Sequence, residues 1–151
     1  MLRRANEGDL TYVLALLEAA GLPTEGVGEH FGSFVVAESG PKVVGAAGLE
    51  LYGANVLLRS VVVAPETQGT GLGSRLTRRA LEEARRHGAR AVYLLTTTAE
   101  GFFPCFGFLR VGRDVVPFGV QDSLEFRGAC PSSAVVMRVA LEQAFTAESV
   151  Q

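Results

Sequence analysis

The sequence predicts an α/β protein with a mixed, mostly antiparallel sheet and helices on both faces. Three apolar runs separated by short glycine-containing turns lie between residues 33 and 64, which is typical of an antiparallel meander. A glycine-rich loop then leads into an amphipathic segment, and three more predicted strands follow it. At 151 residues one domain is expected, over 1–141, with a polar C-terminal tail at 142–151 that frays.

The N-terminal part is expected to hold one short strand and two helices. The segment 2–5 reads as a strand, and 6–20 carries apolar residues at helical spacing, with Asn6 or Asp9 as its cap. The segment 24–31 contains two glycines in eight residues, so only one or two helical turns are expected there. The apolar positions of the first helix are Leu10, Val13, Leu14, Leu17 and Ala20.

The meander consists of three predicted strands at 33–39, 42–52 and 56–64. Gly40 and Pro41 form a turn pair between the first two strands, and the segment 53–55 forms the second turn. Connections this short join neighbouring antiparallel strands.

The C-terminal half is predicted to continue with a helix at 74–88, a strand at 91–98 and a short helix or turn at 99–107. Strands at 108–116 and 134–141 complete the sheet. The apolar stripe of the long helix comprises Leu72, Leu76, Ala80, Leu81 and Ala84.

Composition argues against several functional classes. The net charge of −2 does not indicate the positive surface with which proteins bind nucleic acid. No apolar run reaches the ~20 residues that a membrane span requires. Cys105 and Cys130 form no disulfide framework and lack the spacing of metal ligands. The first residues show no apolar signal-peptide core. We therefore expect a cytoplasmic protein with no metal, no nucleic-acid partner and no membrane partner.

The stretch VVVAPETQGTGLGSRL, residues 61–76, is the most informative part of the chain. A strand, a glycine loop and a helix N-terminus make a ready site for an anion, because the first helical N–H groups have no intrahelical partner. The loop lacks the lysine of a phosphate-binding Walker loop, and its glycine spacing differs from that of a dinucleotide-binding fingerprint. A turn that merely lets strand and helix pack is the alternative.

This stretch resembles the acetyl-CoA-binding motif of the GNAT N-acetyltransferases, whose signature Gln/Arg-x-x-Gly-x-Gly/Ala is matched by Gln68, Gly71 and Gly73. The segment AVYLLTTTAEGFFPCFGF, residues 91–108, resembles the next motif of that family. The resemblance covers about residues 2–140. It implies the GNAT acyl-CoA N-acyltransferase fold and acetyl-CoA as co-substrate, with backbone amides holding the pyrophosphate. The residues it assigns to the cofactor are Val61, Val62, Val63, Gln68, Gly69, Thr70, Gly71, Leu72, Gly73, Ser74 and Phe103.

Two narrower likenesses concern the acceptor. LLTTTAEGFFPCFGF together with LEFRGACPSSAVVM looks like the acetyltransferases found with arsenic-resistance genes, and LTTTAEGFF is similar to the acetyltransferase domain of bacterial N-acetylglutamate synthases. Both imply a small amino acid or an analogue as the acceptor amine.

The sequence departs from the family pattern at Phe103. Many members carry tyrosine four residues before the glycine of the Gly-Phe pair, where it can protonate the departing thiolate, and phenylalanine cannot. Thr96 and Thr97 end the strand where the chemistry is expected, so a hydroxyl there could orient the amine or the acetyl carbonyl; β-propensity and helix capping are the alternative.

Candidates for proton transfer and acceptor binding come from charged residues near these motifs. Glu50, near the end of a strand, is the candidate general base, and His30 is a second titratable group beside the expected acceptor site. Arg59 interrupts an apolar strand, and its planar fork suits a carboxylate; the alternative is an arginine paired inside the protein. Ser60 and Arg127 complete the proposed acceptor contacts.

The sequence thus predicts direct transfer of an acetyl group from acetyl-CoA to the amine of a small, acidic amino acid or analogue, within a ternary complex. Acetylation of a protein or peptide amine is one alternative. A non-catalytic acyl-CoA sensor is another, supported by the missing tyrosine. The oligomeric state is left open, with a homodimer among the alternatives.

Overall fold

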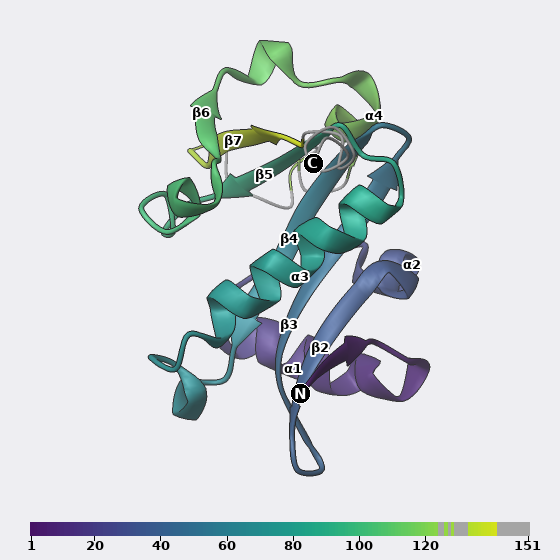
Figure 1. Cartoon of the computed structure of the whole chain (residues 1–151), viewed down its shortest axis with the longest axis vertical. Helices are drawn as coiled ribbons and strands as arrows, with labels where there is room; N and C mark the ends of the chain where they lie inside the picture. The colour runs from purple at the N-terminus through teal and green to yellow at the C-terminus, as the bar shows by residue number, and fades with distance from the viewer. Residues whose placement is uncertain (124–125, 127, 129–132, 142–151) are drawn as a thin grey trace, which may run out of the picture. The chain divides into compact units, whose positions relative to one another are not determined.

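The computed structural model describes residues 1–123, 126, 128 and 133–141. The chain forms two compact units, of which the first holds residues 1–50 and 58–80 and the second holds 51–57 and the described residues from 81 onward. Seven strands pair in the order β1-β2-β3-β4-β5-β7-β6, which makes the mixed sheet that the sequence predicts (Figure 1).

The first unit contains most of the meander and the long helix. Its elements are β1 (Leu2–Arg4), η1 (Glu7–Asp9), α1 (Leu10–Ala19), α2 (Val27–His30), η2 (Phe31–Ser33), β2 (Phe34–Ser39), most of β3 (Lys42–Tyr52), the second half of β4 (Asn55–Val63), η3 (Pro65–Thr67) and the first part of α3 (Leu72–Arg86).

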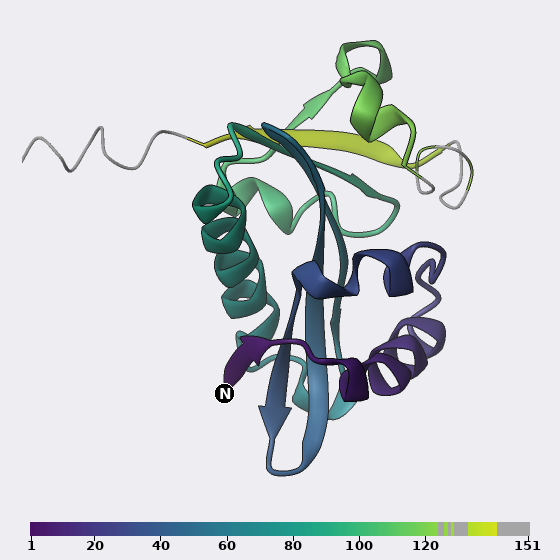
Figure 2. The same cartoon turned by 90° about the vertical axis from the view of Figure 1, so that its right-hand side faces the viewer.

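Within this unit the helices lie on both faces of the strands. β1 pairs antiparallel with β2, and β2 pairs antiparallel with β3. Figure 2 shows α1 and α2 on one side of these strands and α3 on the other. The core under α1 and α2 is formed by Val13, Leu17, Val27, Phe31, Phe34, Val36, Ala46 and Val62.

Helix α3 approaches the sheet closely because β3 carries a glycine beneath it. A Cβ added at Gly45 would lie 2.8 Å from Cδ1 of Leu76 and 3.0 Å from the carbonyl oxygen of Val62. Any larger residue at this position would push the helix away from the strands. Gly45 therefore fixes the depth at which the start of α3 is seated.

Of the two predicted caps, Asn6 caps the 3-10 turn η1, which leads directly into α1, whereas Asp9 makes no side-chain cap for α1. The side chain of Asn6 accepts from the N–H of Gly8 at 2.9 Å, and the Asp9 carboxylate accepts from the N–H of Asn6 at 2.8 Å, which together form a capping box. Asp9 also pairs with Arg3 at 2.8 Å. The hydrogen bonds from Arg3 lower the pKa of the Asp9 carboxyl below its ordinary value.

The second unit pairs its strands differently. Residues Asn55–Leu57 of β4 run parallel to Ala91–Tyr93 of β5. β7 pairs antiparallel with β5 on one side and with β6 on the other. Besides the end of β3, the first part of β4 and the end of α3, the elements of this unit are β5 (Ala91–Thr96), η4 (Phe103–Phe106), β6 (Leu109–Val111), η5 (Arg113–Val115), α4 (Phe118–Gln121) and β7 (Val135–Ala140).

The core of this unit lies between its strands and the segment after β6. It comprises Leu57, Ala91, Tyr93, Val116, Val120 and Val136. The single strand expected at 108–116 is shorter than predicted, since β6 ends at Val111 and a 3-10 turn follows Gly112. Within the described part of the chain, no helix is both long and apolar enough to cross a membrane.

Candidate active site

The strand-to-helix connection in the first unit has the geometry of an anion-binding loop. β4 ends at Val63, and the N–H of Ala64 donates to the carbonyl of Val44 at 2.7 Å, which ties the end of β4 to β3. The hydroxyl of Thr70 donates to the carbonyl of Thr67 at 2.7 Å and so stabilises the loop from within. The chain therefore reaches the start of α3 through a defined turn.

The glycines of this loop are required by the backbone rather than by crowding. Gly69 and Gly71 have φ of +85° and +83°, a backbone conformation that residues other than glycine rarely adopt. A Cβ added at either position would meet no protein atom within 4 Å. The loop is thus open on the side where a side chain would project, and a bulky ligand can approach the backbone there.

The start of α3 adds backbone N–H groups directly after these glycines. Arg75 donates its N–H to the carbonyl of Gly71 at 3.1 Å, so the first helical hydrogen bond starts at that residue. The N–H groups of Leu72, Gly73 and Ser74 precede it and have no partner inside the helix. Together with the positive end of the helix dipole, they can bind an anion such as a diphosphate. Gln68 instead donates its side-chain N–H to the carbonyl of Val63 at 3.3 Å.

The second half of β4 leads into this loop and contains one unusual backbone conformation. Ser60 has φ of +60°, a left-handed conformation inside a strand. Such conformations cost roughly 1–3 kcal/mol and are found mainly where function or surrounding structure demands them. Val62 is buried in the core, whereas Val61 and Val63 are half-buried.

A buried charge cluster lies beside Ser60. The guanidinium of Arg59 donates to a Glu50 carboxylate oxygen at 2.7 Å, and the two side chains are 0% and 1% exposed. Arg59 also donates to the hydroxyl of Ser60 at 3.0 Å and to the carbonyl of Pro23 at 3.3 Å. The other oxygen of Glu50 lies 3.5 Å from Nε2 of His30, whose side chain is 29% exposed.

This arrangement bears on two residues singled out from the sequence. The guanidinium of Arg59 binds a carboxylate, as its chemistry predicts, but that carboxylate belongs to Glu50 of the same chain. This contact favours the alternative in which Arg59 is paired inside the protein. Glu50 is buried, and the half-exposed His30 is the member of the cluster that solvent reaches. The structure therefore brings together Glu50, Arg59, Ser60 and His30. The contact with the carbonyl of Pro23 could not have been expected, because a loop carbonyl leaves no signal in the sequence.

The remaining candidates lie in the second unit. The hydroxyl of Thr96 accepts from the N–H of Ala99 at 2.9 Å and so caps the turn after β5, while Thr97 is exposed. Phe103 is buried, with its ring centroid 5.0 Å from that of Phe102 and 5.7 Å from that of Phe108. These edge-to-face contacts are typical of a packed aromatic cluster. Arg127 lies outside the described residues.

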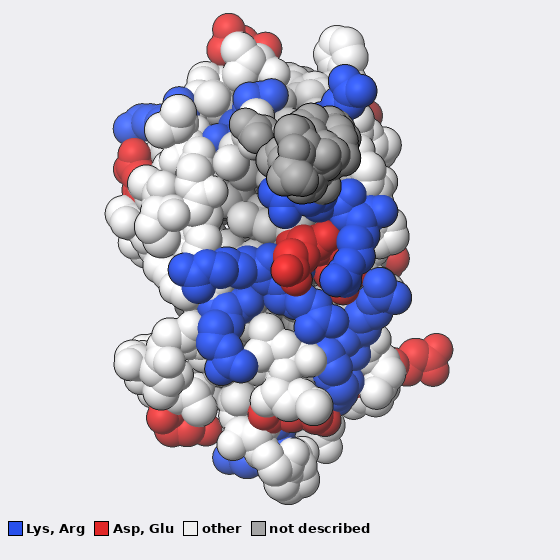
Figure 3. All heavy atoms as spheres, in the orientation of Figure 1, with Lys and Arg blue, Asp and Glu red and all other residues white. Residues whose placement is uncertain are grey.

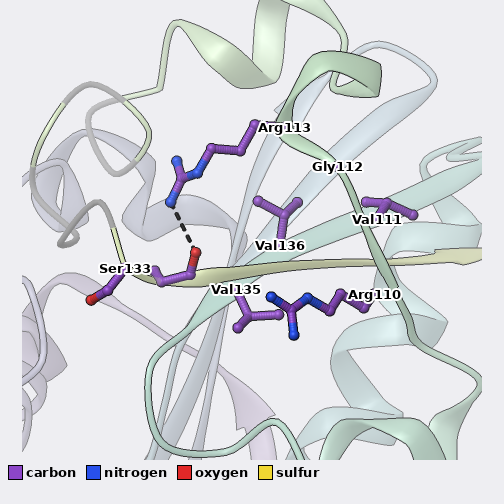
Figure 4. A pocket seen from close by; sticks show the side chains of 8 residues that line it. Arg110, Val111, Gly112, Arg113, Ser133, Val135 and Val136 are labelled. Atoms are coloured by element: carbon purple, nitrogen blue, oxygen red, sulfur yellow. Dashed lines mark hydrogen bonds between the residues drawn. The ribbon is translucent and has the colours of Figure 1, made fainter.

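The second unit also has a surface hollow of about 600 Å³ beside β6 and β7. Arg110 and Arg113 line it, and in the view of Figure 4 they extend past β7 on opposite sides. Arg113 donates to the carbonyl of Ala134 at 2.9 Å, and Arg110 lies 3.5 Å from Glu100 in an exposed pair. The two guanidinium groups do not converge on a common point, so this hollow is a weaker candidate than the loop at α3.

Sequence comparisons identify relatives of this chain. A model of a family described as "Acetyltransferase (GNAT) family" matches residues 6–108. An amino-acid acetyltransferase of Ralstonia nicotianae is 32% identical over 116 residues, which is 73% of this chain and 26% of the relative. A second amino-acid acetyltransferase, from Neisseria meningitidis, is 26% identical over 125 residues, or 77% of this chain and 29% of the relative. The chain thus spans little more than a quarter of these relatives.

Solved structures agree on the fold. N-acetylglutamate synthase from Neisseria gonorrhoeae, complexed with coenzyme A and N-acetyl-glutamate, matches with a TM-score of 0.80 at 23% identity, covering 94% of this chain and 35% of the synthase. A Mycobacterium tuberculosis protein in complex with CoA matches with a TM-score of 0.75 at 25% identity, covering 94% of this chain and 99% of that protein. Because the family model spans more than half of its residues, the chain belongs to the GNAT family of acetyltransferases.

Proposed function

We propose that this protein transfers the acetyl group of acetyl-CoA to the primary amine of a small amino acid or analogue, with an acidic amino acid as the leading acceptor. The observation that carries the proposal is the loop before α3, where Gly69 and Gly71 adopt left-handed φ with open space beside them. In an acetyltransferase family, a strand that leads into such a loop is suited to CoA.

The residues present fit this co-substrate. The N–H groups between Gln68 and Ser74 would bind the diphosphate, because they include the N-terminal amides of α3. The backbone of Val61–Val63 would pair with the amides of the pantetheine arm as a strand does. Phe103 would supply apolar lining for the co-substrate, since phenyl rings offer surface but no proton.

The proposed reaction is direct attack within a ternary complex. The neutral amine of the acceptor forms a C–N bond with the thioester carbonyl, the C–S bond breaks, and CoA leaves as a thiolate. A thiol has an ordinary pKa of about 8.5, so a thiolate can leave and take up a proton from water without an acid at position 103. Thr96 and Thr97 would orient the acetyl carbonyl or the amine through their hydroxyl groups.

Proton removal from the acceptor is assigned to the charge cluster. We propose that Glu50 acts as the base through His30, because Glu50 is buried and His30 is the half-exposed group 3.5 Å from it. Arg59 would hold the Glu50 carboxylate in place through the 2.7 Å pair. A charged pair of this kind keeps the carboxylate oriented even as the imidazole gains and loses a proton.

The acceptor class rests on the relatives. The matched proteins of Ralstonia nicotianae and Neisseria meningitidis are amino-acid acetyltransferases. An acidic acceptor would need a cation, and the sequence offers Arg59, with Ser60 and Arg127, for that role. Because Arg59 is already paired with Glu50, its direct contact with an acceptor carboxylate requires that pair to rearrange.

A thiol-release assay tests the proposal. Purified protein with acetyl-CoA is offered glutamate, aspartate, glutamine, neutral amino acids, the analogues suggested by the arsenic-resistance likeness, and a lysine-containing peptide. We expect release with one amino acid or analogue and little release with the peptide. Release with the peptide alone would favour protein acetylation. CoA binding without release for any amine would favour the sensor alternative and contradict the proposal.

A further inference from the structure

Helix α3 carries an uneven share of the positive charge of the chain. Five of the 14 Lys and Arg residues of the sequence are among the 15 residues of this helix. Figure 3 shows Lys and Arg side chains gathered over the face that carries α3, with acidic side chains among them. Since the net charge of the chain is −2, this concentration does not follow from a basic composition.

Three of these arginines follow the glycine loop directly. Arg75 lies one helical turn after Gly71, and Arg78 and Arg79 lie one turn further on, so all three continue the helix face that starts at the loop. Arg75 and Arg78 are exposed, and Arg79 is half-buried. At 1.5 Å per residue, the Cα atoms of Arg75 and Arg78 are about 6 Å and about 10 Å along the helix from Gly71.

The direction of these side chains brings them closer to the loop. In a helix every Cα–Cβ bond tilts toward the N-terminus, so the side chains of Arg75 and Arg78 leave the helix in the direction of the loop. Their guanidinium groups can therefore contact a ligand whose diphosphate is bound at the first amides of α3. Because the backbone amides already bind the diphosphate, these side chains are suited to a further anionic group beside it.

CoA carries such a group, a phosphate monoester on its ribose 3′ oxygen. A phosphate monoester bears about −1.5 to −2 charges at pH 7, and the planar fork of arginine matches phosphate oxygens in a bidentate manner. We propose that Arg75 and Arg78 bind the 3′-phosphate of CoA and make the protein discriminate CoA from 3′-dephospho-CoA. This inference rests on the proposed use of acetyl-CoA. Arg79 strengthens the local positive potential.

The alternative is a general basic surface that attracts any anion without a defined contact. The two can be separated because α3 offers a matched control at its other end. Arg85 and Arg86 are also exposed and also on α3, but their Cα atoms lie about 21 Å and about 22 Å along the helix from Gly71. A general basic field would be weakened by neutralising either pair, less so by the distant one, whereas a direct contact depends only on the pair beside the loop.

Isothermal titration calorimetry on the full chain provides the test, with CoA and 3′-dephospho-CoA as ligands at about 50 mM salt, where charge screening is modest. We expect the unchanged protein to bind CoA about tenfold more tightly than 3′-dephospho-CoA. The double variant Arg75→Gln/Arg78→Gln should weaken CoA about tenfold and leave 3′-dephospho-CoA within about twofold. Arg85→Gln/Arg86→Gln should preserve the tenfold preference, and thermal melts establish that both variants fold.

Each other result counts against the inference in a distinguishable way. Equal affinity of the unchanged protein for both compounds would overturn the 3′-phosphate contact while leaving the proposed function intact. A clear loss of the preference in the distant Arg85→Gln/Arg86→Gln variant as well would show a general field instead of a site. If neither compound binds to the unchanged protein, the proposed use of acetyl-CoA itself fails.

Discussion

The buried pair of Glu50 and Arg59 allows a stability prediction with a definite magnitude. The two side chains are 1% and 0% exposed and 2.7 Å apart, so neither charge can be hydrated if the other is removed. Removing one partner of such a pair costs about 3–5 kcal/mol. For Arg59→Ala we therefore expect the free energy of unfolding to fall by that amount and the melting temperature to fall by roughly 6–20 °C.

Two further variants separate charge from hydrogen bonding. Arg59→Lys keeps the charge but loses the planar fork, including the bonds to Ser60 and the carbonyl of Pro23, so we expect a loss of about 2 kcal/mol, near 1 kcal/mol for each bond. The double variant Glu50→Leu/Arg59→Met replaces the pair by apolar side chains and should be close to the unchanged protein in stability, because apolar replacements of buried pairs are often neutral or stabilising.

The same variants test the chemistry. If Glu50 acts as the base through His30, the double variant should fold well and yet lose about 10²–10⁴-fold in turnover. Urea denaturation measures the stability, and thiol release from acetyl-CoA measures the turnover. Normal stability of Arg59→Ala would refute the argument from burial, and near-normal turnover of the stable double variant would refute the role of Glu50.

Three other predictions concern separate parts of the molecule. Gly71→Ala should weaken acetyl-CoA binding at least tenfold, about 1.4 kcal/mol, in calorimetry, whereas the matched turn variant Gly40→Ala, with φ of +61° and open space, should lower stability without changing affinity. Equal affinity of the two variants would contradict the assignment of the loop. Phe103→Leu and Phe103→Tyr should both keep kcat within about tenfold, since we assign no proton transfer to this buried ring; a hundredfold loss in a folded Phe103→Leu protein would show that the assignment is wrong. Because the pKa of Asp9 is lowered by Arg3, the stability that Asp9 contributes is present above its ordinary pKa of 3.8 and is lost as the pH falls through its lower folded value. The difference in unfolding free energy between the unchanged protein and Asp9→Asn, measured in urea, should therefore shrink below about pH 4; a difference that stays constant there would disprove the link.

Much of the fold could be predicted because local features of the sequence, such as apolar periodicity and glycine turns, mark its helices and strands. The strand expected at 42–52 is β3 with the same bounds, since glycine turns mark both of its ends. The helix expected at 74–88 forms as α3 and begins two residues earlier, at Leu72, because Gly73 is tolerated in its first turn. The four-residue helix α4 was not predicted, because so short a helix depends on packing rather than on its own sequence period.

The candidate site was less predictable because its contacts are distant in sequence. Arg59 stood out as a charge in an apolar strand, but its partner Glu50 is nine residues away and the carbonyl of Pro23 is 36 residues away. Periodicity indicates which face of a strand a residue occupies and not which residue faces it across the hairpin. The sequence also contained no indication that Ser60 has a left-handed φ, because serine is not a residue type that is typical of this conformation.

The buried pair also bears on the choice between an enzyme and a sensor that only binds acyl-CoA. Burying two charges costs several kcal/mol for each ion, and an apolar pair of similar volume would be at least as stable. A protein that only bound CoA through the backbone amides before α3 would gain nothing from this cost. A half-exposed histidine 3.5 Å from the buried carboxylate gives the cluster a path for a proton to solvent. Proton removal from an amine needs such a path and binding does not, so the cluster favours an enzyme even though position 103 lacks a tyrosine.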